Sequence, residues 1–294
     1  MMAAGSFAKP PRRSLILSPA HAGPALLFLA LNAAAVAPAQ PSPDQAKVLE
    51  SARASALTYS SKLPDFVCTQ TTHRSSWNPS EAAHFATGIS AATPLSASPS
   101  AEADTMGHDI TEQVTYFDQK ESYQVIAVDG RKVSGVTHLQ LQGAMTAGEF
   151  GSALHDVFDP ASKTAFSQGK LTHLHHHQVW EFAFHVPSEH GNIVLLTNPD
   201  RETEVPYSGE VFIDPDTLDV VRIHSTLDLP AGFQLQHGET TVDYRPILIA
   251  GRKYNLPFHS EVRLADTSRV YVNTIDFRRY HKYVAESRIL GVTH

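Results

Sequence analysis

The sequence predicts a mainly β (α+β) fold: a single antiparallel sheet of about ten strands, curled into a half-barrel, with two helices packed on it. Alternation of apolar and polar residues recurs from residue 66 to the C-terminal region, with short turn signals between the alternating segments. Helical periodicity, in contrast, occurs in only two places. Strands and helices do not alternate along the chain, which argues against a doubly wound nucleotide-binding fold.

The strands are predicted from inward-facing residues spaced two apart. The segment 66–77 is rich in threonine, and two turn signals, Asp129-Gly130 and Asp214-Pro215-Asp216, join later segments as hairpins. The apolar members of the later strands are Ile110, Val114, Tyr116, Tyr123, Val125, Tyr207, Val211, Ile213, Val221, Ile223, Leu227, Phe258, Val262, Leu264, Tyr271, Ile275 and Phe277.

Both helices have start and stop signals. Ser42-Pro43-Asp44-Gln45 combines an N-cap serine, a proline in the first turn and a glutamine that closes a capping box, so a helix is predicted over 43–61. A second capping box, Thr146 to Glu149, predicts a helix whose buried stripe is Phe150, Leu154 and Val157 and which Pro160 ends.

The N-terminus has the order of a secretory signal peptide. Basic residues precede an apolar run over 25–36 and the small-residue site Ala37-Pro38-Ala39, so residues 1–39 are predicted to be removed by cleavage before Gln40. Residues 40–294 are then one periplasmic or secreted β-rich domain, with a flexible Ala/Ser/Pro-rich insertion at 78–108. An uncleaved membrane anchor is the alternative, and peripheral association with the cell envelope is a further expectation.

Charge and cysteine content exclude several classes of protein. The net charge of −7 becomes −10 without residues 1–39, which contain three basic residues and no acid. We therefore expect no nucleic-acid partner, and the basic segment 278–282 is interpreted as a solvated edge strand. The single cysteine, Cys68, excludes a disulfide framework and is predicted to be a small buried strand residue.

Three segments, 62–70, 148–160 and 207–215, resemble a family of exported bacterial proteins of unknown function, over most of residues 43–290. The strand pair 210–214 and 220–223, separated by an acidic-proline turn, also resembles the repeated element of the LolA/LolB-like lipoprotein carriers and related envelope-stress sensors. That second resemblance implies a curled half-barrel whose hollow is closed by helices and accepts acyl chains.

The histidine run 173–177 is the one concentration of chemically active side chains. If this run is one strand, His173, His175 and His177 project from the same face and could bind zinc together with His185 or His224. The sequence has no nucleophile elbow, phosphate loop or His-Glu-x-x-His motif, so no catalytic residue is assigned. An exposed polar face is the preferred interpretation, and no cofactor other than this zinc is expected.

We therefore expect a binding protein rather than an enzyme, with a hydrophobic ligand, an acyl chain or a lipoprotein as its partner. A zinc-dependent hydrolase built on the histidine run and an envelope protein-interaction module remain as alternatives. The expected ligand-binding side chains come from two strands and are Trp180, Phe182, Phe184, Tyr207, Val211 and Ile213.

Overall fold

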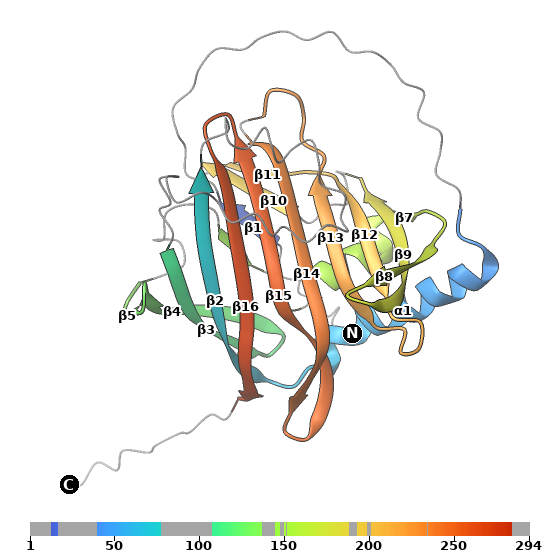
Figure 1. Ribbon diagram of the computed structural model, residues 1–294, viewed down its shortest axis with the longest axis horizontal. Helices are drawn as coiled ribbons and strands as arrows, with labels where there is room; N and C mark the ends of the chain where they lie inside the picture. Colours follow the sequence, from blue (N-terminus) through green and yellow to red (C-terminus); the bar gives the residue numbers. More distant parts are fainter. Residues whose placement is uncertain are drawn as a thin grey trace, which may run out of the picture.

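The main feature of the computed structural model is one open antiparallel sheet of twelve strands (Figure 1). The structure describes residues 13–16, 40–77, 108–136, 145–147, 150, 152–187, 193–198, 201–233 and 235–283. In spatial order the strands are β5 (Arg131–Lys132), β4 (Lys120–Val128), β3 (His108–Phe117), β2 (Phe66–Trp77), β16 (Val270–Lys282), β15 (Arg252–Asp266), β14 (Leu235–Ile249), β13 (Val220–Leu227), β12 (Tyr207–Ile213), β9 (His177–Val186) and β7 (Ala165–Phe166), while β8 (Lys170–Leu174) pairs with β9. The predicted curled half-barrel is confirmed, with twelve strands in place of about ten.

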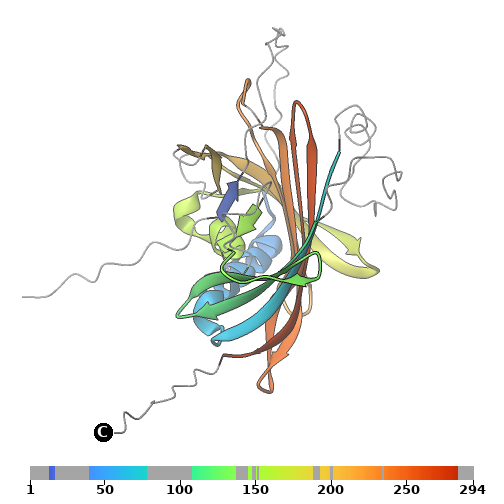
Figure 2. The same cartoon turned by 90° about the vertical axis from the view of Figure 1, so that its left-hand side faces the viewer.

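Two α-helices lie on the same side of this sheet (Figure 2). Helix α1 (Pro43–Lys62) begins at the predicted capping box: Gln45 N donates to Ser42 Oγ at 3.4 Å, and Ser42 N donates to Gln45 Oε1 at 3.1 Å. Helix α3 (Ser152–Phe158) is followed by a 3₁₀ turn, η2 (Pro160–Ser162). Neither α-helix in the described part of the chain combines the length and apolar composition that a bilayer crossing requires.

The second helix starts later than its sequence signal predicts. Thr146 lies in a short strand, β6 (Met145–Ala147), and its backbone pairs with another strand, so the helix begins at Ser152 instead. Phe150, Leu154 and Val157 are all buried, as the predicted stripe requires.

A second, four-stranded sheet lies on the helix side of the large sheet (Figure 2). Its order is β11 (Arg201–Glu204), β10 (Ile193–Asn198), β1 (Arg13–Ile16) and β6. Strand β1 runs parallel to β10 and antiparallel to β6, and it falls within the predicted leader. The predicted insertion lies outside the described residues, except that His108 begins β3.

Residues directly opposite each other on neighbouring strands share one face of the large sheet. One inner row crosses seven neighbouring strands, from β9 to β2, and every member is buried against the helix side: Phe182, Val211, Ile223, Val242, Ser260, Ile275 and Thr72. The core therefore sits between the inner face of the sheet and the two helices.

The hairpin at Asp129-Gly130 is confirmed, with φ values of 50° and 72° at the two turn residues. The interpretation of residues 278–282 as an edge strand is wrong. They end β16, which lies between β2 and β15 in the middle of the sheet.

Candidate functional site

The expected ligand-binding residues lie together on the inner face. Phe182 and Phe184 of β9 and Tyr207, Val211 and Ile213 of β12 are all at most 4% exposed and belong to one core with α1 and α3. Trp180 is partly buried beside them, with its ring centroid 6.0 Å from that of Phe182. We call this set of six residues the apolar sector.

A second set of inner-face residues is polar, and the sequence analysis did not identify it. These side chains are at most 8% exposed and come mainly from β2, β3, β15 and β16, which β13 and β14 separate from the strands of the apolar sector: Gln70, Thr72, Ser76, Glu112, Ser225, Ser260 and Asn273. We call this set the polar band. The available signal was β2 itself, because every second residue from Gln70 onwards is polar on the face that begins with Phe66 and Cys68.

The hydrogen bonds within the polar band leave specific groups unmatched. Gln70 Nε2 donates to Glu112 Oε2 at 3.1 Å and to Thr72 Oγ1 at 3.4 Å, so the amide nitrogen faces the carboxylate. Gln70 Oε1, Ser225 Oγ and Ser260 Oγ are buried, and none has a hydrogen-bond partner among the described residues. An unmatched buried polar group costs about 1–3 kcal/mol, which a bound ligand can recover.

A cluster of phenol and thiol groups lies between the C-terminal half of α1, which carries Tyr59, and strands β2, β3 and β16. Burial raises the pKa of Cys68, Tyr59 and Tyr280 far above their ordinary values, and burial together with Glu121 raises the pKa of Tyr116 to about 12. These groups are therefore neutral at physiological pH. The prediction that Cys68 is a buried strand residue is confirmed, and its raised pKa opposes nucleophilic chemistry.

Helix α1 covers the inner face with a shallow apolar stripe of Leu49, Ala52 and Ala56. Its N-terminal end is attached through Gln45, whose amide forms hydrogen bonds with both backbone groups of Gly169. Gly169 lies directly against Phe182: a Cβ at this position would stand 2.4 Å from Phe182 Cε1. The residue that holds the N-terminal end of α1 thus contacts the apolar sector.

The histidine run does not form one strand, and the prediction that its alternate members share a face is wrong. His175 and His176 form the two-residue turn between β8 and β9, with φ values of 48° and 71°. His173 is opposite Gln178 and His177 is opposite Leu174, so these two histidines project from opposite faces. Histidine tolerates positive φ better than most residues, which explains how the run accommodates a turn.

The histidines proposed as metal ligands have other contacts. His175 Nε2 lies 3.2 Å from Arg222 Nη2, His185 Nδ1 lies 3.0 Å from Ser208 Oγ, and His224 Nδ1 lies 2.9 Å from Thr241 Oγ1. Across the residues that the structure describes, no group of three or more His, Cys, Asp and Glu side chains could hold a metal ion. The geometry therefore gives no support to a hydrolase centred on His173, His175 and His177.

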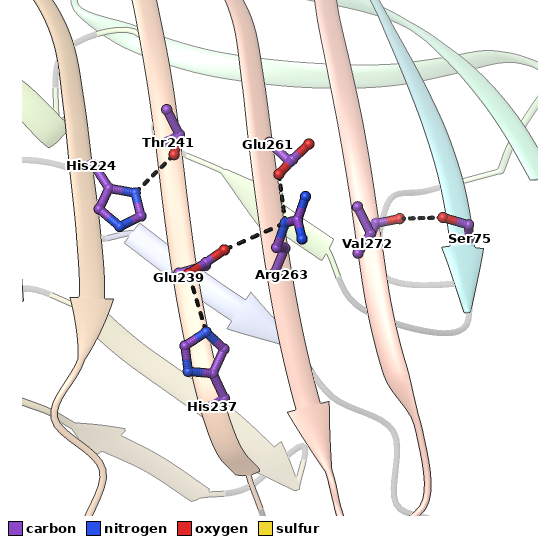
Figure 3. A network of polar contacts seen from close by, with 8 residues as sticks. All are labelled: Ser75, His224, His237, Glu239, Thr241, Glu261, Arg263 and Val272. Atoms are coloured by element: carbon purple, nitrogen blue, oxygen red, sulfur yellow. Dashed lines mark hydrogen bonds and ion pairs between the residues drawn. The ribbon is translucent and has the colours of Figure 1, made fainter. Parts of the chain in front are cut away.

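The outer face of the sheet is covered by polar groups that satisfy one another (Figure 3). Arg263 Nε lies 3.4 Å from Glu239 Oε1 and 2.6 Å from Glu261 Oε1, and His237 Nε2 lies 3.2 Å from Glu239 Oε2. Burial opposes ionisation of Glu239, but the hydrogen bond from His237 and the nearby cations lower its pKa overall. The unmatched Gln70 Oε1, Ser225 Oγ and Ser260 Oγ, in contrast, are on the inner face, which we take as the candidate site.

No protein-family model matches the chain, and no curated protein matches it. Among solved structures, a LolA superfamily protein from Nitrosomonas europaea is 10% identical, with a TM-score of 0.31 over 82% of this chain and 94% of that one. A putative outer membrane lipoprotein-sorting protein domain from Vibrio parahaemolyticus is 10% identical, with a TM-score of 0.32 over 79% and 89%. MucB in complex with MucA(peri) is 13% identical, with a TM-score of 0.19 over 78% and 93%. The half-barrel itself is established by the strand order and register given above.

Proposed function

We propose that the protein is an exported, non-enzymatic binding protein that carries an amphiphilic ligand with an acyl chain on the inner face of its half-barrel. One observation carries this proposal: the same buried face has an apolar sector and, across β13 and β14, a polar band with unmatched hydrogen-bonding atoms. An acyl chain suits the first and a polar head suits the second.

A buried acyl chain could replace the contacts that helix α1 makes with the inner face. The apolar side chains of α1 contribute roughly 5–7 kcal/mol by burial, since Leu49, Ala52 and Ala56 are buried and Val48 and Tyr59 pack partly buried against the same core. The two hydrogen bonds between Gln45 and Gly169 add about 1 kcal/mol each. A chain of about twelve methylenes contributes roughly 10 kcal/mol when it is buried. Burial of such a chain therefore contributes about as much as the contacts that α1 would lose, and α1 would act as the lid of the site.

The leader predicted from the sequence supports a periplasmic or secreted location, which in a Gram-negative host is the periplasm, where acyl chains must cross an aqueous space. Its partner would be a lipid or the acyl chains of a lipoprotein. In this proposal the inner-face side chains only bind the ligand, and none of them has a catalytic role.

A titration with a fluorescent fatty-acid probe tests this function. We expect saturable binding with a large negative heat-capacity change, because apolar surface is buried. Trp180→Asp should weaken binding at least about tenfold, since it places a charge at the edge of the apolar sector without disturbing a fully buried side chain. The matched control is Leu248→Asp, because Leu248 is 62% exposed. Equal binding by both variants, or no binding by the wild type at micromolar concentration, would contradict the proposal.

A further inference from the structure

We infer that the polar band selects the head group of the ligand: it binds an uncharged, donor-bearing head, an amide N–H or a hydroxyl, and disfavours an anionic one. This inference rests on the proposed function and names the ligand class of the same site. Its centre is Gln70, Glu112 and Ser260.

The polar band lies at the end of a row of inner-face residues that begins in the apolar sector. Along the inner row, Phe182 and Val211 lead through Ile223 and Val242 to Ser260. These five residues occupy adjacent strands, so the row spans roughly 19 Å from its first member to its last. A chain lying across the strands along this row ends at the polar band.

The hydrogen-bonding state of Gln70 defines what the head group must supply. Its amide nitrogen already donates to Glu112 and Thr72, which fixes the orientation of the amide and turns Oε1 away from the carboxylate. Oε1 is a pure acceptor, and it is buried with no donor among the described residues. The unmet requirement at this position is therefore a hydrogen-bond donor.

Ser260 supplies the complementary group. Its side chain is fully buried, its hydroxyl has no partner in the described part of the chain, and it can either donate or accept. Ser260 is opposite Ile275, which is opposite Thr72, so two strand spacings separate it from the residues around Gln70. A head group with both a carbonyl and an N–H, or with a hydroxyl, can engage both sides.

The acceptor at Gln70 determines which heads are excluded. A carboxylate or phosphate head brings only acceptor oxygens and cannot donate to Gln70 Oε1, and the Glu112 side chain directly opposite Gln70 is buried on the same face.

Competition among probes with one shared chain tests the inference on the full chain. Hexadecanamide, hexadecanol, palmitate and hexadecyl phosphate would each displace the fluorescent fatty-acid probe. We expect the amide and the alcohol to bind at least about tenfold more tightly than the two anions. Glu112→Gln should bring the two anions to within about threefold of the amide, because it adds an amide N–H donor opposite Gln70.

Two further variants separate the head from the chain. Gln70→Leu should remove the preference for the amide while the chain still binds, and Ser260→Ala, which removes only a hydroxyl, should reduce that preference if the larger change unfolds the protein. Thr69→Leu, on the outer face of the same strand, is the matched control. Binding of all four probes with equal affinity would overturn the head-group inference and leave the proposed function standing. Unchanged selectivity in Gln70→Leu and Ser260→Ala would overturn it as well. Binding of none of the four would overturn both.

Discussion

Gln45 and Gly169, 124 positions apart in the sequence, are joined by two hydrogen bonds. Gln45 Nε2 donates to Gly169 O at 2.7 Å, and Gly169 N donates to Gln45 Oε1 at 3.2 Å. The same Gln45 oxygen also closes the capping box with Ser42 N. One side chain therefore both starts helix α1 and fastens it to the loop between β7 and β8, against the apolar sector.

Loss of the Gln45 amide should loosen α1 as a unit. Gln45→Ala removes two buried hydrogen bonds to Gly169 and one half of the capping box, so we expect a loss of about 2–3 kcal/mol in the free energy of unfolding. Amide hydrogen exchange in α1 should accelerate more than exchange in β14 and β15. Lys47→Ala, at an exposed position of the same helix, is the control. Unchanged exchange in α1 would show that Gln45 does not fasten it.

Gly169 should tolerate no side chain. Because an added Cβ would stand 2.4 Å from Phe182 Cε1, Gly169→Ala must displace either the loop or a fully buried ring. We expect destabilisation of about 1–3 kcal/mol, measured by urea unfolding, against Gln168→Ala at the exposed neighbouring position as the control. Equal stability of the two variants would mean that the loop and the ring are not in contact in solution.

The buried phenol and thiol groups predict a loss of stability at alkaline pH. Their pKa values are raised in the folded state by burial, so the unfolded chain releases protons first as pH rises. These groups contribute fully to the free energy of unfolding below the pKa values of the unfolded chain, about 8.5 for cysteine and about 10 for tyrosine. The contribution falls as the pH rises from those values toward the raised pKa values of the folded state. Urea unfolding at pH 7 to 11 measures this loss. Cys68→Ala should remove the part that begins near pH 8.5, and identical pH profiles would contradict the assignment.

The turn at His175 and His176 should be improved by residues that prefer positive φ. Both residues have left-handed backbone, for which Asn-Gly is the favoured pair in a two-residue hairpin. We expect the double change His175→Asn and His176→Gly to raise the free energy of unfolding by about 0.5–1 kcal/mol.

Replacement of His173, His175 and His177 together by glutamine should leave stability nearly unchanged. A cooperative loss of bound zinc on that replacement would restore the metal hypothesis.

The fold was predictable where side-chain alternation and turn chemistry agree. Val211 and Ile223 lie on the inner face as their spacing predicts, and Asp129-Gly130 forms the expected turn, because both signals are local. The turn at His175-His176 was missed because no Gly or Asn marks it and the run is polar on both faces. The start of α3 was missed because Thr146 pairs with a strand from residues 13–16, a contact that local sequence cannot indicate.

The candidate site was predictable only in its apolar half. Phe182 and Val211 follow from alternation, but burial of Gln70, Glu112 and Ser260 depends on what covers three separate strands. A polar residue at an inward position is ambiguous in the sequence, since the same pattern fits a solvated face. Only the assembled sheet brings these residues to one surface and reveals which of their atoms lack partners.

Native mass spectrometry of the protein purified from the exported fraction, followed by extraction of bound lipid, tests the central claim most directly. We predict a chain that begins at Gln40 and carries a stoichiometric adduct, released by unfolding and identified as an acyl-bearing molecule. A chain of bare mass, which also takes up no palmitate or hexadecanamide when these are added at micromolar concentration, would contradict the claim that the inner face is a binding site.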